Sequence, residues 1–163
     1  MGNEVEVRRA SPGDAESLTR IAFAAKRYWG YPERWVLQWS EALTITPEFV
    51  RDNEVYAAIV GGEPFGFYAL AGTGHALELE HLWVSPARIG SGAGRLLFEH
   101  AMEAAASRGA NSIKIEADPN AEGFYLRMGA RRTGENVYQI EGLRRVLPLL
   151  KMELPRERPG TMS

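Results

Sequence analysis

The feature that most constrains this fold is an apolar strand pattern that passes through a glycine-rich loop directly into a helix pattern. The segment HALELEHLWV alternates as a strand does, and the helical pattern of GAGRLLFEHAMEAAASRG follows. Between them, glycines stand at positions 90, 92 and 94. Glycine permits positive φ and leaves no Cβ in the way of a ligand, and the N–H groups of a first helical turn attract anions. The junction therefore predicts a phosphate-binding loop, with Arg88 and Arg95 available for charge-assisted contacts.

Two familiar glycine motifs do not describe this loop. A dinucleotide-binding fingerprint needs the spacing G-x-G-x-x-G, and a P-loop needs a lysine directly after its last glycine. The segment GSGAGR contains neither. The plain alternative is a glycine-rich turn that binds nothing, so a ligand site needs support from the rest of the chain.

The N-terminal third of the sequence reads as a strand followed by helices. A strand is expected over residues 4–10, and Ser11 is a typical N-cap for a helix that ends at Gly30. A second helix is expected from Pro32 through PERWVLQWSEAL, and a short third one from Pro47. The periodicity of the first helix predicts that it buries one face, made of Leu18, Ile21, Ala22 and Ala25.

The remainder of the chain reads mainly as strands. The Gly61–Gly62 pair predicts a hairpin turn between two strands. Further strands are expected in HALELEHLWV, NSIKIEA, ARRTGENVYQI and RRVLPLLKMEL, and a short helix in DPNAEGFYLRMG. The glycine-led helix is expected to bury Ala93, Leu96, Leu97, Ala101 and Ala104. This order of elements indicates an α+β or mixed α/β protein with one central sheet.

Length and composition set the outer limits. A chain of 163 residues is expected to form one domain, residues 1–154, followed by a polar tail over 155–163 that is predicted to be disordered. The net charge of −2 argues against a nucleic-acid partner. The absence of cysteine excludes disulfides and thiolate catalysis and suits a reducing compartment. Without a secretory signal or an apolar run of about 20 residues, we expect a cytoplasmic protein with no membrane partner.

Two blocks of the sequence resemble the GNAT superfamily of N-acetyltransferases, and the likeness extends over about residues 4–154. The first block, LELEHLWVSPARIGSGAGRLLFEHA, is similar to the family's acetyl-CoA signature. Its usual Gln or Arg is replaced by Ile89, with Arg88 one residue earlier. The matching positions are Leu82, Trp83, Val84 and Pro86 at the strand end and Gly92 and Gly94 in the loop.

The second block, DPNAEGFYLRMGARRTGE, resembles a conserved helix of the same superfamily. Ala121, Phe124, Tyr125 and Gly129 match in register, and Ala130 replaces the usual Phe. Asp118 stands at the usual Asn position, and Asn120 follows two residues later. Either side chain could contact the pantetheine arm of the cofactor.

The resemblance implies the GNAT-like acyl-CoA N-acyltransferase fold. This is a central, mostly antiparallel sheet of six to seven strands with one splayed strand pair, flanked by about four helices. The resemblance also implies acetyl-CoA as the cofactor, with its pantetheine arm beside the strand of residues 82–84 and its diphosphate on the amides of residues 89–95. The implied cofactor-binding residues are Leu82, Trp83, Val84, Ile89, Gly90, Ser91, Gly92, Ala93, Gly94, Arg95, Asn120, Phe124 and Tyr125.

Acetyl transfer to an amine needs a group that accepts the amine proton and can use an acid at the leaving thiolate. The resemblance implies Tyr125 as this acid, and the alternative is a packed aromatic residue. Glu78 and Glu80 share one strand face because side chains alternate, and either could accept the proton. The resemblance favours Glu78 by register, and the alternative for both is a solvated strand face.

Aromatic residues crowd the segment between the first two helices. Trp29 and Tyr31 flank Gly30 and are expected to wall the acceptor pocket or to hold a cation against their rings. Trp35 and Trp39 are four residues apart and are expected to pack a helix face into the core. We expect no metal site, because His75, His81 and His100 have no ligand spacing; each should be structural or exposed.

These features predict an N-acetyltransferase that moves the acetyl group of acetyl-CoA to a primary amine of a small molecule or peptide. Direct attack in a ternary complex is expected, because the chain has no cysteine to carry an acetyl group. The alternative is a non-catalytic acyl-CoA-binding or regulatory module of the same fold. A nucleotide-dependent kinase is a weaker alternative, since the required lysine and metal-binding carboxylates are missing. The C-terminal edge strands leave a homodimer open.

Overall fold

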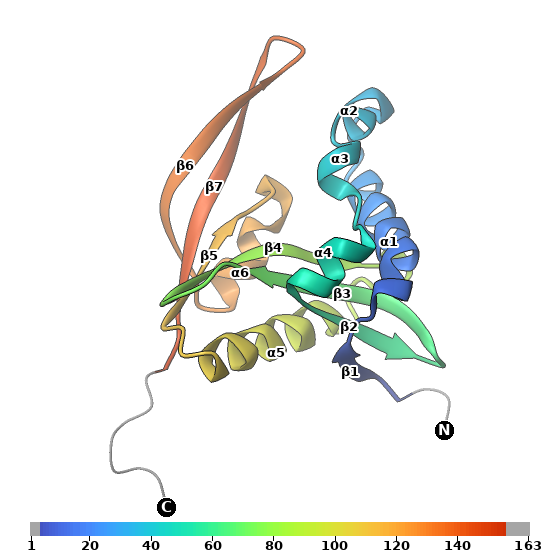
Figure 1. Ribbon diagram of the computed structural model, residues 1–163. Helices are drawn as coiled ribbons and strands as arrows, with labels where there is room; N and C mark the ends of the chain where they lie inside the picture. Colours follow the sequence, from blue (N-terminus) through green and yellow to red (C-terminus); the bar gives the residue numbers. More distant parts are fainter. Residues whose placement is uncertain (1–3, 156–163) are drawn as a thin grey trace, which may run out of the picture. The chain divides into compact units, whose positions relative to one another are not determined.

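The computed structural model describes residues 4–155, whose strands form one seven-stranded sheet in the order β1-β2-β3-β4-β5-β7-β6 (Figure 1). The β1–β2, β2–β3, β5–β7 and β6–β7 pairs are antiparallel, and the β4–β5 pair is parallel. This confirms the expected α+β class with a central, mostly antiparallel sheet. The chain divides into two compact units. The first holds the residues up to Ala71 together with Glu80–His100, and the second holds Gly72–Leu79 together with the residues from Ala101 onward.

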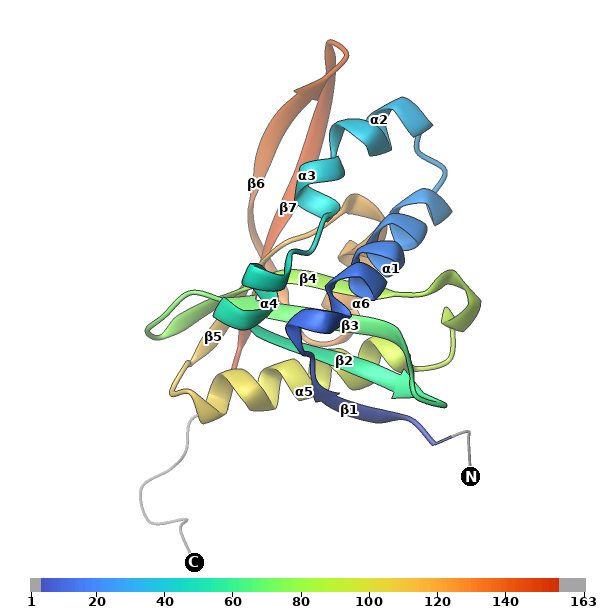
Figure 2. The ribbon, with the colours of Figure 1, turned by 45° about the vertical axis from the view of Figure 1, so that its right-hand side comes forward.

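The first unit contains the N-terminal strands and most of the helices. Its strands are β1 (Glu6–Arg9), β2 (Glu54–Val60), β3 (Glu63–Ala71) and the end of β4 (Ala76–Val84). Its helices are α1 (Ala15–Tyr28), α2 (Glu33–Gln38), α3 (Ser40–Leu43), α4 (Pro47–Asp52) and the start of α5 (Ala93–Ser107). Within this unit, α1 and α4 lie on the same side of β2 and β3 (Figures 1 and 2).

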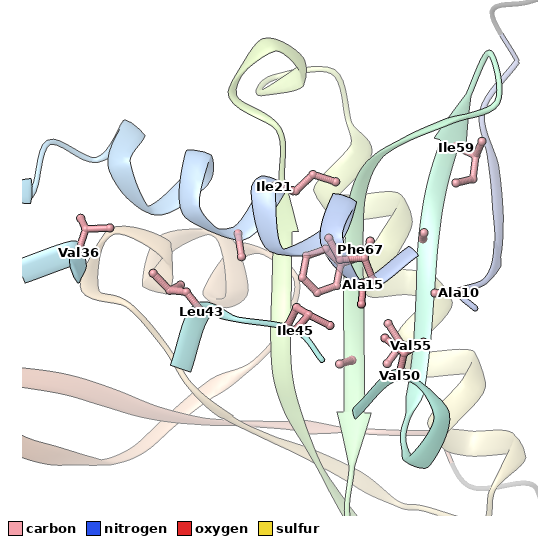
Figure 3. Close-up of a cluster of buried hydrophobic side chains, with 14 residues drawn as sticks. Ala10, Ala15, Ile21, Val36, Leu43, Ile45, Val50, Val55, Ile59 and Phe67 are labelled. Carbon is pink, nitrogen blue, oxygen red and sulfur yellow. The ribbon is translucent and has the colours of Figure 1, made fainter. Parts of the chain in front are cut away.

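The core of the first unit lies between α1 and the strands β2 and β3 (Figure 3). The predicted buried face of α1 is confirmed, because Leu18 and Ala22 are fully buried and Ile21 and Ala25 nearly so. Phe67 of β3 meets this face, and Ile45 and Val50 close the cluster from the segment around α4. This burial of apolar surface is what fixes the amphipathic α1 on the sheet.

Two boundaries in this unit differ from the sequence prediction. A 3-10 turn (Pro12–Asp14) precedes α1, and the Asp14 carboxylate accepts a hydrogen bond from the Ser11 N–H at 2.9 Å. The single helix expected from Pro32 is broken into α2 and α3 at Trp39. Trp39 packs its ring against the buried cluster, so the chain turns there rather than continuing as one helix. Gly30 ends the first helical segment as expected, with a φ of 80°.

The β2–β3 hairpin is confirmed, with both Gly61 and Gly62 at positive φ. Further along β3, Gly66 allows the signature strand to approach closely. A Cβ added to Gly66 would lie 3.0 Å from the carbonyl oxygen of Trp83 and 3.1 Å from Leu97 Cδ1. A larger residue would therefore push β4 and α5 away from β3.

The second unit contains the C-terminal strands. It comprises the beginning of β4, the rest of α5, β5 (Ser112–Glu116), a 3-10 turn (Pro119–Ala121), α6 (Glu122–Arg127), β6 (Arg131–Ile140) and β7 (Leu143–Glu153). The two closing strands form a long hairpin (Figure 1). Its turn, Glu141–Gly142, has positive φ at both residues. The sequence prediction gave both strands but not this turn, because Glu rarely adopts positive φ.

The predicted buried face of α5 is wrong at Leu96 and only partly right at Ala104. Ala93, Leu97 and Ala101 are buried as expected, but Leu96 is 40% exposed and Ala104 is half-buried. Phe98 and Ala105 are buried instead. The buried stripe therefore follows positions four residues apart, and Leu96 falls one step of about 100° to its side.

No helix among residues 4–155 is both long and apolar enough to cross a membrane. In the same residues, no cluster of three or more His, Cys, Asp or Glu side chains is arranged to hold a metal ion. The tail predicted to be disordered lies, apart from Pro155, outside the described residues.

Candidate active site

The loop before α5 presents main-chain N–H groups at a helix start. A 3-10 turn (Pro86–Arg88) leads into it, and the amides of Ile89 and Ser91 donate to turn carbonyls at 3.3 and 3.2 Å. The first helical bond of α5 runs from Leu96 N to the Gly92 carbonyl at 3.0 Å. The N–H groups of Ala93, Gly94 and Arg95 come before this bond. They therefore have no carbonyl acceptor one turn earlier in the helix, and they point outward from its N-terminus. An anion at this position would meet converging donors and the positive end of the helix dipole.

The glycines keep this loop bare. Gly90 and Gly92 have φ angles of 84° and 87°, and a Cβ added to either would find no atom within 4 Å. The two flanking arginines have other contacts: the Arg88 guanidinium lies 5.1 Å above the Phe65 ring, and Arg95 Nε lies 3.5 Å from Glu99 Oε2. Main-chain N–H groups are therefore the donors that the loop itself presents.

The signature strand β4 extends beyond its pairing with β5. The parallel ladder runs from the pair of Ala76 and Ser112 to the pair of Leu79 and Ile115, and β4 continues to Val84. Its last three residues, Leu82, Trp83 and Val84, are half-buried. Main-chain groups on this extension can therefore take a partner other than β5.

Glu78 and Glu80, the two candidate bases, are both exposed and alternate with the buried Leu77 and Leu79. The expected alternation is confirmed up to this point of β4. Their surroundings differ, because Glu78 is paired in the ladder with Lys114 whereas Glu80 follows the last pair.

The turn after β5 carries the second predicted group of site residues. Asn120 is exposed, and both its backbone N–H and its Nδ2 donate to Asp118 Oδ1 at 2.9 Å. Tyr125 of α6 is only 6% exposed, and its ring lies 5.2 Å from that of Phe124. Burial raises the pKa of Tyr125 well above its usual range, so its hydroxyl stays protonated at neutral pH. A protonated hydroxyl is what a general acid requires.

An aromatic box in the first unit encloses the ammonium of Lys26. Lys26 Nζ lies 4.4 Å from the ring centroid of Trp39, 5.0 Å from Tyr31, and 6.0 Å from both Trp29 and Trp83. The side chain is nearly buried, at 8% exposed. Trp29 and Trp83 also touch each other, with ring centroids 6.1 Å apart. The cation that these rings surround belongs to the chain itself, since it is a lysine of α1.

The sequence prediction had divided these aromatic residues differently. Tyr31 and Trp39 both pack against the buried cluster, whereas Trp35 is half-buried and stacks on Tyr31. Lys26 itself was missed. The available signal was its position, one residue after Ala25 and four after Ala22, which places it beside the apolar face of the helix.

Comparison with known families decides which family the chain belongs to. A model of the acetyltransferase (GNAT) domain matches residues 32–154, which include the glycine loop, the signature strand and α6. The chain belongs to the GNAT family of acetyltransferases. It is accordingly an acetyl-CoA-dependent N-acetyltransferase, and acetyl-CoA is its cofactor.

Individual GNAT relatives agree with this assignment. A peptidyl-lysine N-acetyltransferase, YjaB, of Salmonella typhimurium is 29% identical over 117 residues, covering 71% of this chain and 75% of the relative. YjaB of Escherichia coli is 32% identical over 90 residues, covering 55% and 56%. The PaiA N-acetyltransferase of Thermoplasma acidophilum, solved in complex with coenzyme A, shares the fold with a TM-score of 0.74 at 18% identity, over 92% of this chain and 99% of that one. An N-acetyltransferase of Rhodopseudomonas palustris has a TM-score of 0.77 at 22% identity, over 94% and 98%.

In this GNAT chain the aromatic box stabilises the fold through Lys26. We expect Lys26→Met to lower the free energy of unfolding by about 2 kcal/mol, because the desolvated cation–π contacts are lost while the apolar stem is kept. Urea unfolding monitored by tryptophan fluorescence measures this loss. Arg20→Met in the same helix is the matched control, since Arg20 is exposed and pairs with Glu16 on the surface. Equal losses in the two variants would contradict a role for the rings.

His81 of β4 is a half-buried histidine that is neutral at pH 7. Trp83 Nε1 donates to His81 Nδ1 at 3.0 Å, and the His81 ring lies against Phe49 and Phe67. Burial lowers the pKa of His81 from 6.5 to about 4. His81 is therefore structural, as predicted, and it holds the Trp83 indole that forms one wall of the box. His75 is exposed, and His100 Nδ1 lies 2.7 Å from the Tyr68 hydroxyl.

The lowered pKa of His81 makes stability depend on pH. The unfolded chain binds a proton at His81 below pH 6.5, while the folded chain does so only near pH 4. Its contribution is therefore fully present above pH 6.5 and is lost as the pH falls through that window, by at most about 3 kcal/mol. We expect His81→Gln to flatten this part of the curve of unfolding free energy against pH. His75→Gln is the control, and an unchanged slope in His81→Gln would refute the assignment.

Proposed function

We propose that this GNAT acetyltransferase acetylates a primary amine, with a peptidyl lysine as the first candidate acceptor. The observation that carries the proposal is the bare loop before α5, which offers main-chain donors to the diphosphate of acetyl-CoA. The preference for peptidyl lysine rests on the YjaB relatives, which are named for that activity. A small-molecule amine is the alternative acceptor.

In this proposal the cofactor lies along β4 and the start of α5. The diphosphate accepts hydrogen bonds from the loop, chiefly from Ala93, Gly94 and Arg95, because the amides of Ile89 and Ser91 already donate within the turn. The pantetheine arm pairs with the extension of β4 at Leu82, Trp83 and Val84. The residues assigned to the cofactor are Leu82, Trp83, Val84, Ile89, Gly90, Ser91, Gly92, Ala93, Gly94, Arg95, Asn120, Phe124 and Tyr125.

The proposed chemistry is direct attack of the amine in a ternary complex. The chain contains no cysteine that could carry an acetyl group between two half-reactions. Tyr125 donates a proton to the departing thiolate from a hydroxyl that is protonated at neutral pH. Glu78 or Glu80 accepts the amine proton, since both are exposed side chains of β4.

Trp29 and Tyr31 are proposed to face the acceptor on the side of their rings that Lys26 does not occupy. In this arrangement the ammonium of Lys26 lies on one face of the two rings and the acceptor lies on the other. We further propose that residues 1–154 act as one domain in the cytoplasm, in keeping with the absence of cysteine. We also propose that two copies of the chain pair as a homodimer through the edge strand β6.

Release of coenzyme A thiol from acetyl-CoA tests this function. We expect release in the presence of a lysine-containing peptide whose N-terminus is blocked, with the product identified by mass spectrometry. The same peptide with its lysine already acetylated is the control and should give no release. Release with small diamines but with no lysine peptide would exclude the peptidyl acceptor, and a chain that binds coenzyme A without releasing thiol for any amine would refute the proposal.

A further inference from the structure

A largely buried ion pair links β7 to the turn after β5. Arg145 Nη2 lies 3.0 Å from Asp118 Oδ2, and the two side chains are only 13% and 7% exposed. By comparison, the pair of Arg131 and Glu153 is 61% and 58% exposed. Removal of the cation would leave a carboxylate that is almost out of contact with water, which is strongly unfavourable. The ion pair therefore holds β7 and the turn after β5 together within the second unit.

The other oxygen of Asp118 organises the turn. Asp118 Oδ1 accepts from the backbone N–H of Asn120 and from Asn120 Nδ2, both at 2.9 Å, and the Asp118 carbonyl accepts from Ala121 N at 2.8 Å. Upstream, the Ala117 N–H donates to the Pro148 carbonyl of β7 at 2.9 Å. Four hydrogen bonds thus hold a short turn, and Asp118 takes part in three of them.

These hydrogen bonds determine which end of the Asn120 side-chain amide faces away from Asp118. Because Nδ2 points to Asp118, the carbonyl oxygen Oδ1 points away from it, on the opposite side of the same planar group. A side-chain carbonyl is a hydrogen-bond acceptor, and the pantetheine arm of coenzyme A carries amide N–H donors. If Asn120 rotated freely, its NH2 group would face these donors for part of the time and repel them.

We propose that Arg145 is a positioning residue for cofactor binding. Through Asp118 it fixes the turn and holds Asn120 with its carbonyl oxygen toward an amide N–H of pantetheine. This inference rests on the proposed assignment of Asn120 to the cofactor. Because Arg145 acts through Asp118 in this inference, its effect falls on cofactor affinity and not on the rate at saturation.

Kinetics of three single variants test this role. We expect Arg145→Met to raise the KM for acetyl-CoA and weaken coenzyme A binding by about tenfold, with kcat unchanged within about twofold. Arg145→Lys keeps the charge without the planar fork and should recover part of the affinity. Arg144→Met is the matched control, because Arg144 is the exposed neighbour on the same strand, and it should resemble the unmodified chain.

A purely structural role predicts different results. If Arg145→Met is folded by thermal melting and binds coenzyme A within about twofold of the unmodified chain, the inference is wrong. If Arg145→Met does not fold, the double variant Arg145→Met with Asp118→Asn removes the unpaired buried charge. We expect the double variant to recover the melting temperature but to retain the raised KM, and recovery of both would overturn the inference. Loss of coenzyme A binding in the unmodified chain would instead refute the proposed function.

Discussion

Tyr125→Phe should lower kcat by about a hundredfold or more while coenzyme A binding stays within about twofold. The substitution removes one hydroxyl and keeps the ring, which is 6% exposed and packed beside Phe124. The departing thiolate then lacks its proton donor, so the loss appears in turnover and not in affinity. Steady-state thiol release and calorimetry with coenzyme A separate the two quantities.

Tyr138→Phe is the matched control for this prediction. Tyr138 is also in the second unit, but its hydroxyl is on the exposed face of β6 and donates to Glu116 Oε2 at 2.7 Å. Its loss should leave kcat unchanged. Equal turnover in Tyr125→Phe and the unmodified chain would remove Tyr125 from the acid role and leave it as a packed aromatic residue.

Gly92→Val should weaken coenzyme A binding by about a hundredfold. Gly92 has a φ of 87°, which a β-branched residue strongly disfavours, so the loop must move or its amides must turn away. The new side chain would also extend into the open space above the loop. Two charge-assisted hydrogen bonds to the diphosphate account for a loss of this size. Titration calorimetry with coenzyme A measures it.

Gly62→Val separates the loop from general backbone strain. Gly62 has a φ of 81° and equally open surroundings, but it lies in the β2–β3 turn. This control should lose stability to a similar extent and keep its affinity for coenzyme A. Unchanged affinity in a folded Gly92→Val protein would show that the diphosphate binds elsewhere.

The sequence prediction succeeded where the determining interactions are local. The passage from strand to helix after Val84 was predicted correctly because the strand end, the glycines and the helix start are adjacent in the chain. The buried face of α1 followed from its periodicity for the same reason. Leu96 was misplaced because one helical step separates it from the buried Leu97, and apolar character alone does not define the centre of a stripe.

The contacts that were missed join residues far apart in sequence. In the box around Lys26, Trp83 of β4 lies beside rings from the segment after α1. No local sequence pattern predicts this contact between distant segments. A lysine near an apolar helix face normally reads as solvent-exposed. Likewise, Asp118 and Arg145 are 27 positions apart, and their pairing depends on the registration of β7 with β5. Such details require the tertiary structure.

The burial of Lys26 has a consequence for a protein that works with a reactive thioester. The lysines of this chain are Lys26, Lys114 and Lys151, and arginine supplies the other basic residues apart from histidine. Lys114 is exposed, whereas the ammonium of Lys26 is enclosed by four rings. Spontaneous acylation by the protein's own donor would therefore modify the exposed amine of Lys114 before the enclosed amine of Lys26.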